Sequence, residues 1–302
     1  MRVRGLPAVL AVLLAAACSR PPARIVLAVP GLPPPPPQDF SGVVLPPGIA
    51  VVDGRLYAEK DGAEMVLVPA GEFLMGQDEK GFVMSWSADE APAHRVRLSP
   101  YLINRHPVTV GQFRRFCAST GRPAPPPGSD RMPVADATFA TAEAYAAWAG
   151  LELATEARWE RAARGIDGRA YPWDPVRREL EVRHPNRDMP VGSFPIEASP
   201  AGCLDMVGGP KEWCADWMGP YAAGEPPLDP TGPRTGEFRI LRNDYYERSL
   251  TSPRGIYLPG VEIPLYEDHT EWRAPIPVSG RNADRPDGKA AFRCARGLSP
   301  RR

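Results

Sequence analysis

The sequence has 302 residues and equal numbers of basic and acidic side chains, 36 of each, so its formal net charge is zero. This balance argues against a nucleic-acid-binding protein and against attraction to an anionic lipid surface. A hydrophobic fraction of 43% is enough for a packed core, and the length fits one large domain or two small ones.

The first 18 residues have the pattern of a bacterial lipoprotein signal peptide with its lipobox. Arg2 and Arg4 precede an apolar stretch too short to span a bilayer, and three alanines then lead to Cys18. We expect lipidation of Cys18, because several acyl chains on one residue give a stable anchor. The alternative is an ordinary signal peptide that leaves this cysteine free. Ser19 favours the outer membrane, so the protein would face the periplasm or the exterior of the cell envelope.

Residues 19–49 have the composition of a disordered, proline-rich tether. The five consecutive prolines Pro33–Pro37 favour an extended polyproline II conformation. Residues 50–62 form a short lead-in that fits a hairpin around Asp53-Gly54. The main domain is expected at residues 63–298.

Short strands open this domain and helices follow. Apolar runs flank a turn at residues 65–76, and residues 95–98 alternate basic and apolar side chains. Three helices are predicted from apolar spacing and caps, at 109–121, at about 140–150 and at 155–165. Prolines and glycines recur every few residues after the third helix. The pattern indicates a loop-rich α+β domain.

A series of short motifs is spread over residues 63–297. The first is V-P-A-G-E-F-L-M-G at 68–76, and the most distinctive is L-A-T-E-A-R-W-E-R-A-A-R-G at 153–165. Later ones include D-M-V-G at 205–208, E-W at 212–213 and F-R-C at 292–294. In this order they resemble the motifs of the formylglycine-generating enzyme family, also called the sulfatase-modifying factor family. The resemblance implies a formylglycine-generating-enzyme-like fold, distantly similar to C-type lectins, with short strands and a few helices.

The resemblance also implies that the copper site of the catalytic members is missing. Those members bind copper(I) with two cysteines spaced C-x4-C, because soft thiolates suit this ion. Arg248 and Pro253 occupy the corresponding positions, and no cysteine lies between Cys214 and Cys294. We therefore expect no copper, and we interpret the chain as a divergent member without the catalytic cysteines.

The calcium sites of the family are implied only in part. Gly209 stands where the family has a calcium-binding asparagine, whereas Glu212 is kept. A second calcium loop survives only as Asn186, with Asp188 in a shortened segment. Calcium takes about six to eight oxygen ligands, so we expect the loss of at least one site.

The segment that follows Arg242 takes the place where catalytic members bind their peptide. It is rich in aromatic and charged side chains, which either line a binding groove or pack an irregular loop. The residues assigned to this candidate groove are Asn243, Asp244, Tyr245, Tyr246, Arg248 and Arg254.

No other catalytic motif is found. The chain has no H-E-x-x-H, G-x-S-x-G or P-loop pattern, and its four histidines show no close ligand spacing. The pairing of the remaining cysteines is left open, because four cysteines allow three connectivities. These are Cys117, Cys203, Cys214 and Cys294.

The sequence therefore favours a non-catalytic binding or scaffolding module of the cell envelope, anchored to the membrane, with a protein or peptide partner and no nucleic acid. Two alternatives stay open. One is a formylglycine-generating or related metal-dependent oxidase that acts on protein cysteines. The other is a lectin-like module that binds glycans.

Overall fold

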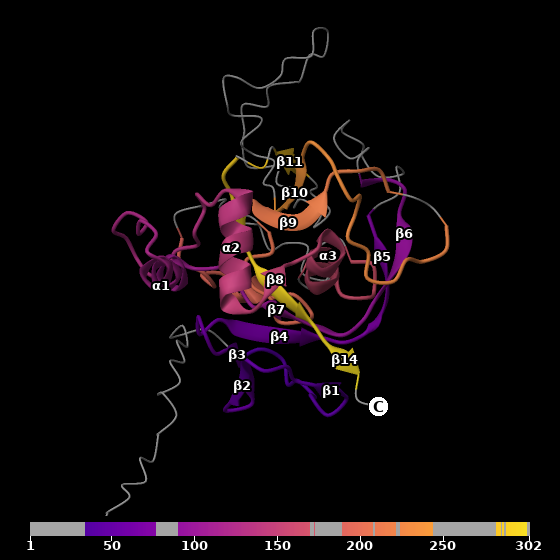
Figure 1. Cartoon of the computed structure of the whole chain (residues 1–302). Helices are drawn as coiled ribbons and strands as arrows, with labels where there is room; N and C mark the ends of the chain where they lie inside the picture. The colour runs from indigo at the N-terminus through magenta and orange to yellow at the C-terminus, as the bar shows by residue number, and fades with distance from the viewer. Residues whose placement is uncertain are drawn as a thin grey trace, which may run out of the picture.

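The structure, a computed structural model, describes residues 34–76, 90–169, 172, 189–207, 209–221, 224–243, 282–284, 286 and 288–300. These residues form short strands and three α-helices joined by long connections (Figure 1). The longest helices have 11 residues, and within the described ranges no helix could traverse a bilayer. The expected loop-rich α+β class is confirmed.

The largest sheet has six strands in the order β2-β3-β4-β7-β13-β8. Their bounds are β2 Ile49–Val52, β3 Arg55–Ala58, β4 Glu64–Val68, β7 Tyr101–Asn104, β8 Glu152–Leu153 and β13 Cys294–Gly297. Every pairing in this sheet is antiparallel. The C-terminal strand β13 thus lies in the interior of the sheet, between β7 and β8.

Three smaller sheets complete the fold. A four-stranded sheet has the order β11-β10-β9-β12, with β9 Glu212–Trp217, β10 Arg239–Arg242, β11 Asn282–Asp284 and β12 Ala291–Phe292. The hairpin of β5 Gly71–Met75 and β6 His94–Leu98 stands alone, and β1 Val43–Val44 pairs with β14 Ser299–Pro300. In Figure 1, β9, β10 and β11 lie at the top of the domain and β1 to β3 at the bottom.

The three helices begin and end where the sequence predicts. They are α1 Val110–Thr120, α2 Phe139–Ala149 and α3 Glu156–Arg164. The side chains of Thr109, Thr138 and Thr155 cap their N-termini, each by accepting a hydrogen bond from a backbone N–H in the first turn. Gly121 and Gly150 end α1 and α2 in the left-handed conformation, which glycine adopts at low cost.

Two hydrophobic cores lie on opposite faces of β4. Because side chains alternate along a strand, Met65 and Leu67 enter one core while Val66 and Val68 enter the other. The first core contains α1 and α2, and the second contains α3 and the β5–β6 hairpin. The large sheet therefore needs apolar side chains on both faces, as the continuous apolar run of β4 provides.

The folded domain begins earlier than the sequence analysis placed it. Residues 43–44 and 49–52 form β1 and β2, although residues 19–49 were expected to be a disordered tether. The hairpin at Asp53-Gly54 is confirmed, with φ of 50° and 73° at these two residues, and it joins the large sheet. The composition of residues 19–49 indicates a polyproline conformation. It cannot show that residues 43–44 and 49–52 pair with strands elsewhere in the chain.

The end of the proline run also lies on the domain. The side chain of Gln38 accepts a hydrogen bond from the Leu67 N–H at 3.1 Å and donates to the Leu67 carbonyl at 3.5 Å. A Cβ added to Gly202 would lie 2.6 Å from Cδ of Pro36, so glycine is needed for this close approach. Residues 36–38 are therefore held against β4 and the loop around residue 202.

Candidate functional site

The candidate groove begins directly after β10, and a buried ionic network holds the end of this strand. Arg242 is fully buried and donates to Glu156 at 3.2 Å and to Glu160 at 2.9 Å. Glu160 also accepts from Arg164 at 2.6 Å. Both carboxylates belong to α3, so the network fixes β10 to that helix.

A second buried ion pair joins β9 to the C-terminal part of the chain. Glu212 accepts hydrogen bonds from Nε of Arg293 at 2.6 Å and from Nη2 at 2.8 Å. The Trp159 indole N–H donates to the same carboxylate at 3.0 Å. All three side chains have zero exposure. The bidentate geometry is the strong form of this interaction in an interior of low polarity.

Asn243 is buried at the base of the candidate groove and does not form an accessible wall. It is only 4% exposed, and its Nδ2 donates to the Asp205 carbonyl at 2.9 Å. Its φ of 67° is left-handed, a conformation that asparagine tolerates better than most residues. The other groove residues, Asp244, Tyr245, Tyr246, Arg248 and Arg254, lie outside the described residues, as does Pro253.

The sequence analysis did not identify a pair of interacting carboxyl groups, Glu197 and Asp205, near Asn243. Burial and the nearby Asp205 raise the pKa of Glu197 from 4.5 to about 7. Burial also raises the pKa of Asp205, from 3.8 to about 6, while a 2.7 Å hydrogen bond from the Gly192 N–H opposes that shift. The two residues are eight positions apart in an irregular segment, so no periodic signal brings them together.

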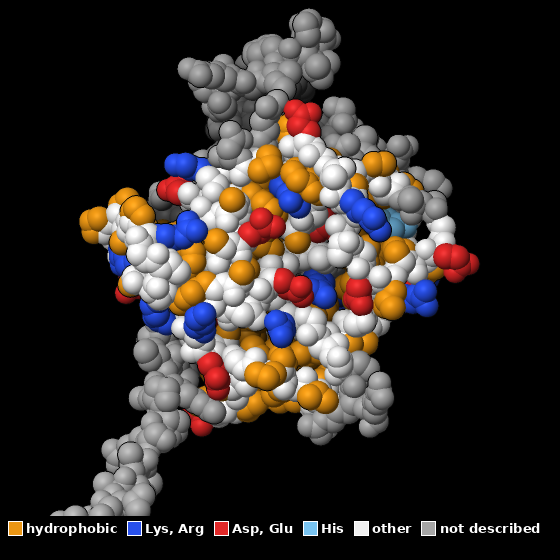
Figure 2. Space-filling model, viewed as in Figure 1, with side chains coloured by type: hydrophobic (Ala, Val, Ile, Leu, Met, Phe, Trp, Pro, Cys, Tyr) orange, Lys and Arg blue, Asp and Glu red, His pale blue; other side chains and the backbone are white. Residues whose placement is uncertain are grey.

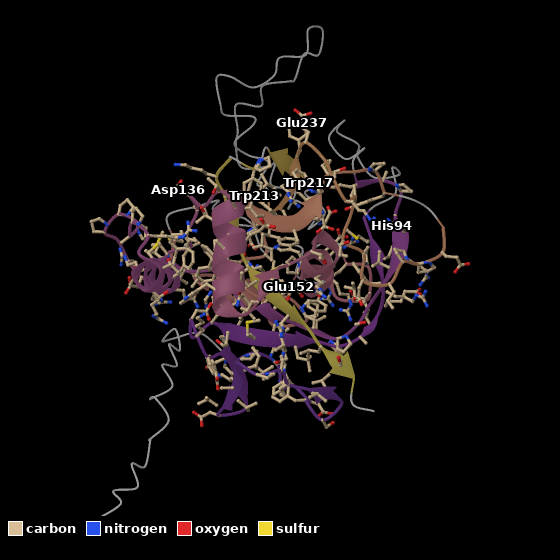
Figure 3. All side chains as sticks on the ribbon, in the orientation of Figure 1. His94, Asp136, Glu152, Trp213, Trp217 and Glu237 are labelled. Carbon is tan, nitrogen blue, oxygen red and sulfur yellow. The ribbon has the colours of Figure 1, made fainter. Side chains whose placement is uncertain are left out.

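Arg239 at the start of β10 was also missed as an individual site residue. Its guanidinium carbon lies 4.0 Å from the ring centroid of Phe139 and 3.6 Å from that of Trp217. Its Nη1 donates to the Ala215 carbonyl at 2.5 Å. The cation is thus stacked between two aromatic rings. Figure 3 labels Trp213 and Trp217 on β9 in the upper part of the domain, with Glu237 above them.

All four cysteines after Cys18 are buried free thiols. Cys117 and Cys294 lie in the first core, whereas Cys203 and Cys214 lie in the second. Burial raises the pKa of Cys203 to about 11 and raises the pKa values of the other three thiols as well. None of the connectivities left open by the sequence is present in this structure.

These thiols do not fit a copper(I) centre of the family type. Such a centre needs two thiolates that converge on one ion. Here each thiol is held in its neutral form among apolar side chains, and Arg248 and Pro253 have no sulfur. The described thiols therefore do not support a mechanism that uses copper.

The residues implied for calcium do not come together in the described part of the chain. Both oxygens of Glu212 accept hydrogen bonds from Arg293, while Asn186 and Asp188 lie outside the described residues. The described ranges contain no group of three His, Cys, Asp or Glu side chains that could hold a metal ion. The described residues therefore do not support a calcium-dependent role either.

The two described histidines have structural surroundings. Burial lowers the pKa of His106 to about 4, and its Nδ1 lies 2.9 Å from the Pro107 carbonyl. The ring of His94 packs on Tyr221 with the centroids 4.6 Å apart. His184 and His269 fall outside the described residues.

The visible surface carries no large patch of one charge. Basic, acidic and hydrophobic side chains are interspersed over the face shown in Figure 2. This distribution agrees with the formal net charge of zero.

Fold and site together define an α+β domain in which buried arginine–carboxylate pairs fix β9 and β10 to their neighbours. Residues 55–297 match the family described as the sulfatase-modifying factor enzyme 1-like domain. The chain belongs to this family, which includes oxidoreductases. The match begins eight residues before the boundary expected from the sequence motifs.

Relatives support this assignment, and a solved structure supports the fold. A formylglycine-generating enzyme of Thermomonospora curvata is 31% identical over 306 residues, covering 76% of this chain and 92% of the relative. The serine/threonine-protein kinase pkn1 of Chlamydia pneumoniae is 35% identical over 230 residues, or 64% of this chain, and this chain spans only 35% of its length. The structure of PvdO from Pseudomonas aeruginosa has the same fold, with a TM-score of 0.57 and 24% identity over 84% of this chain and all of that one.

Replacing Arg242 by methionine should strongly destabilise the fold, because Glu156 and Glu160 would lose the buried cation that they share, and Glu160 would keep only Arg164 as an ion-pair partner. We expect a loss of about 3–5 kcal/mol in the free energy of unfolding, measured by urea denaturation. The matched control is Arg95→Met, since Arg95 pairs with Glu72 at the surface with side chains 68% and 37% exposed. This control should cost roughly 0–1 kcal/mol. Equal losses in the two variants would contradict the structural role of the network.

Replacing Glu197 by glutamine should change how stability depends on pH. A raised carboxyl pKa means that the folded state binds the proton more tightly, so stability declines as pH rises from 4.5 through about 7. The variant lacks this loss, and at pH 8 it should be more stable than wild type by roughly 1–3 kcal/mol. At pH 4 the two proteins should be alike. Urea unfolding at both pH values is the measurement, with the exposed Glu225→Gln as the control; curves that stay parallel at all pH values would refute the prediction.

Proposed function

We propose that the chain is a lipid-anchored, non-catalytic binding or scaffolding module of the bacterial cell envelope. The observation that carries the proposal is the state of its cysteines. All four beyond Cys18 are buried thiols with raised pKa values, and none stands at the two copper-ligand positions of the family. A thiolate nucleophile or copper ligand must be both deprotonated and accessible.

The residues that lead into the candidate groove are rigidly held. Arg242 is fixed to α3, and Asn243 is fixed to the Asp205 carbonyl. The chain therefore still has a rigid base from which the next residues emerge. Rigid support of a variable segment is what a binding site requires, whatever the chemistry of that segment.

The comparisons also support a modular role. The chain matches only a part of pkn1, which shows that a related domain occurs inside longer proteins. In the present chain the additional part is the N-terminal region. Lipidation at Cys18, followed by residues 19–33 as a proline-rich spacer, would keep the domain near the membrane.

An oxidase of the family, with a different set of metal ligands, is the second candidate. The 31% identity to a formylglycine-generating enzyme over most of both chains favours it. In that case the ligands would have to come from residues outside the described ranges, since the described ones contain no suitable cluster.

A copper titration with a peptide oxidation assay separates the two candidates. With the Cys18→Ser variant of the chain, we expect no tight stoichiometric copper(I) binding and no conversion of a sulfatase-type peptide cysteine to formylglycine, because no thiolate pair is available. Mass spectrometry of the peptide is the measurement, and the Thermomonospora curvata enzyme serves as the positive control. Tight copper binding together with peptide oxidation would overturn the non-catalytic proposal.

A pulldown from native membranes tests the binding role. We expect a specific partner to be retained by wild type and reduced at least about tenfold by a combined Tyr245→Ala and Tyr246→Ala variant, because aromatic side chains dominate binding energies at interfaces. Arg95→Ala, an exposed change on β6, is the matched control and should retain the partner. Equal recovery with the groove variant and the control would place the partner elsewhere on the protein.

A further inference from the structure

Arg161 on α3 is a buried arginine without a counter-ion among the described residues. It is only 8% exposed, and no hydrogen bond or ion pair joins its side chain to another described residue. Its Nε is closed off from solvent and has no acceptor. Every other buried arginine of the described ranges has a carboxylate partner: Arg105 has Glu64, Arg164 has Glu160, Arg242 has Glu156 and Glu160, and Arg293 has Glu212.

The surroundings of Arg161 supply no negative charge at neutral pH. Burial lowers the pKa of Arg161, and within the described residues the one opposing influence is the Tyr101 hydroxyl. Burial also raises the pKa of Tyr101 well above 10, so this hydroxyl is neutral, and it donates its hydrogen to the Arg158 carbonyl at 2.6 Å. Arginine stays protonated in proteins. Arg161 therefore carries a positive charge that its described neighbours do not balance, which is a costly arrangement.

Gly71 leaves one side of this guanidinium open. The residue starts β5, which lies beside α3 (Figure 1). A Cβ added to Gly71 would lie 3.8 Å from Nη2 of Arg161, and apart from the chain neighbours of Gly71 no other described atom lies within 4 Å of that point. The φ of Gly71 is not positive, so the backbone does not require glycine here. The preceding Pro69 and Ala70 are exposed, so the open position adjoins solvent.

Glu72, the carboxylate next to this opening in the sequence, is engaged elsewhere. Side chains alternate along β5, so Gly71 and Phe73 face the second core and α3, whereas Glu72 faces the other way. Glu72 accepts a hydrogen bond from Arg95 at 2.7 Å on the surface. A counter-ion for Arg161 therefore has to come from outside the described part of the chain.

We propose that Arg161 and the open position over Gly71 form a binding site for a carboxylate group carried by a ligand. The two terminal nitrogens of a guanidinium match the two oxygens of a carboxylate. One unbalanced cation also suits a single negative charge, whereas a phosphate group carries about −1.5 to −2 at pH 7. The site lies where α3 meets β5, and it is separate from the candidate groove that begins after β10.

Urea unfolding in acetate and in chloride, at equal ionic strength, is the first measurement. Replacing chloride by acetate at about 0.1 M should lower the unfolding equilibrium constant of wild type at least about threefold. Inorganic phosphate should have a smaller effect than acetate. N-acetylglutamic acid amide shows whether the carboxylate of an acidic side chain also reaches the site, and a response to acetate with or without it agrees with the proposal.

Arg161→Met shows whether these effects depend on the guanidinium, because anions also act on stability non-specifically. The variant should lose the response to acetate. In chloride its unfolding constant should be no larger than that of wild type, since an uncompensated buried charge has been removed. Arg164→Met is the matched control, because Arg164 lies on the same helix, is 7% exposed and pairs with Glu160. This control should raise the unfolding constant at least about a hundredfold.

Gly71→Val keeps the guanidinium and closes the opening. The variant should fold, because a Cβ at 3.8 Å from Nη2 makes an ordinary contact and β-branched residues suit a strand. It should no longer respond to acetate.

The proposal is wrong if wild type and Arg161→Met respond equally to acetate, or if phosphate, corrected for its effect on Arg161→Met, stabilises wild type more than acetate does. It is also wrong if Arg161→Met is as unstable in chloride as Arg164→Met, because Arg161 would then have a structural partner. Should Gly71→Val fail to fold, these comparisons still decide. They need neither a membrane partner nor an oxidation assay, so they are independent of the proposed function.

Discussion

The fully buried pair of Glu212 and Arg293 is the contact on which the rest of the domain depends. Arg293 lies between β12 and β13, and besides Glu212 it donates to the carbonyl oxygens of Asn104, Arg105 and Leu204 at 3.3, 3.4 and 3.1 Å. One guanidinium therefore joins the large sheet, the four-stranded sheet and the loop before β9. A buried guanidinium is tolerated in the interior when its N–H groups are paired, as they are here with one carboxylate and three carbonyl oxygens.

This arrangement shows which contacts hold the family fold together around the end of β10. The buried arginine–carboxylate pairs join α3 to β10, and β9 to the residue between β12 and β13. Arg248 and Pro253, at the two positions where the resemblance places the copper ligands, follow Asn243 along the chain and lie outside the described residues.

The sequence predicted the local features well. Threonine caps and following glycines located the helices to within a residue or two, because these signals act over one turn of chain. Ordered motifs identified the family, and its fold was confirmed. The Asp53-Gly54 hairpin was also correct, since its turn type is encoded by two adjacent residues.

Contacts between residues far apart in the sequence could not be predicted as well. Gln38 bonds to Leu67 and Pro36 lies on Gly202, but neither contact has a local signal, and the tether was therefore extended too far into the chain. Asn243 was assigned to the groove because of its position in a motif, whereas its left-handed backbone turns the side chain into the interior. The Glu197 and Asp205 pair depends on an irregular loop, for which periodicity gives no information.

The position of β13 has a consequence for how the protein reaches its native state. This strand comes about 140 residues after β8 in the chain, yet it fills the gap between β7 and β8, so the large sheet cannot close before residues 294–297 have been made. A polypeptide that must cross a membrane in an unfolded form benefits from that delay. If the chain is exported as proposed, this topology helps to keep it unfolded during translocation until β13 has crossed the membrane.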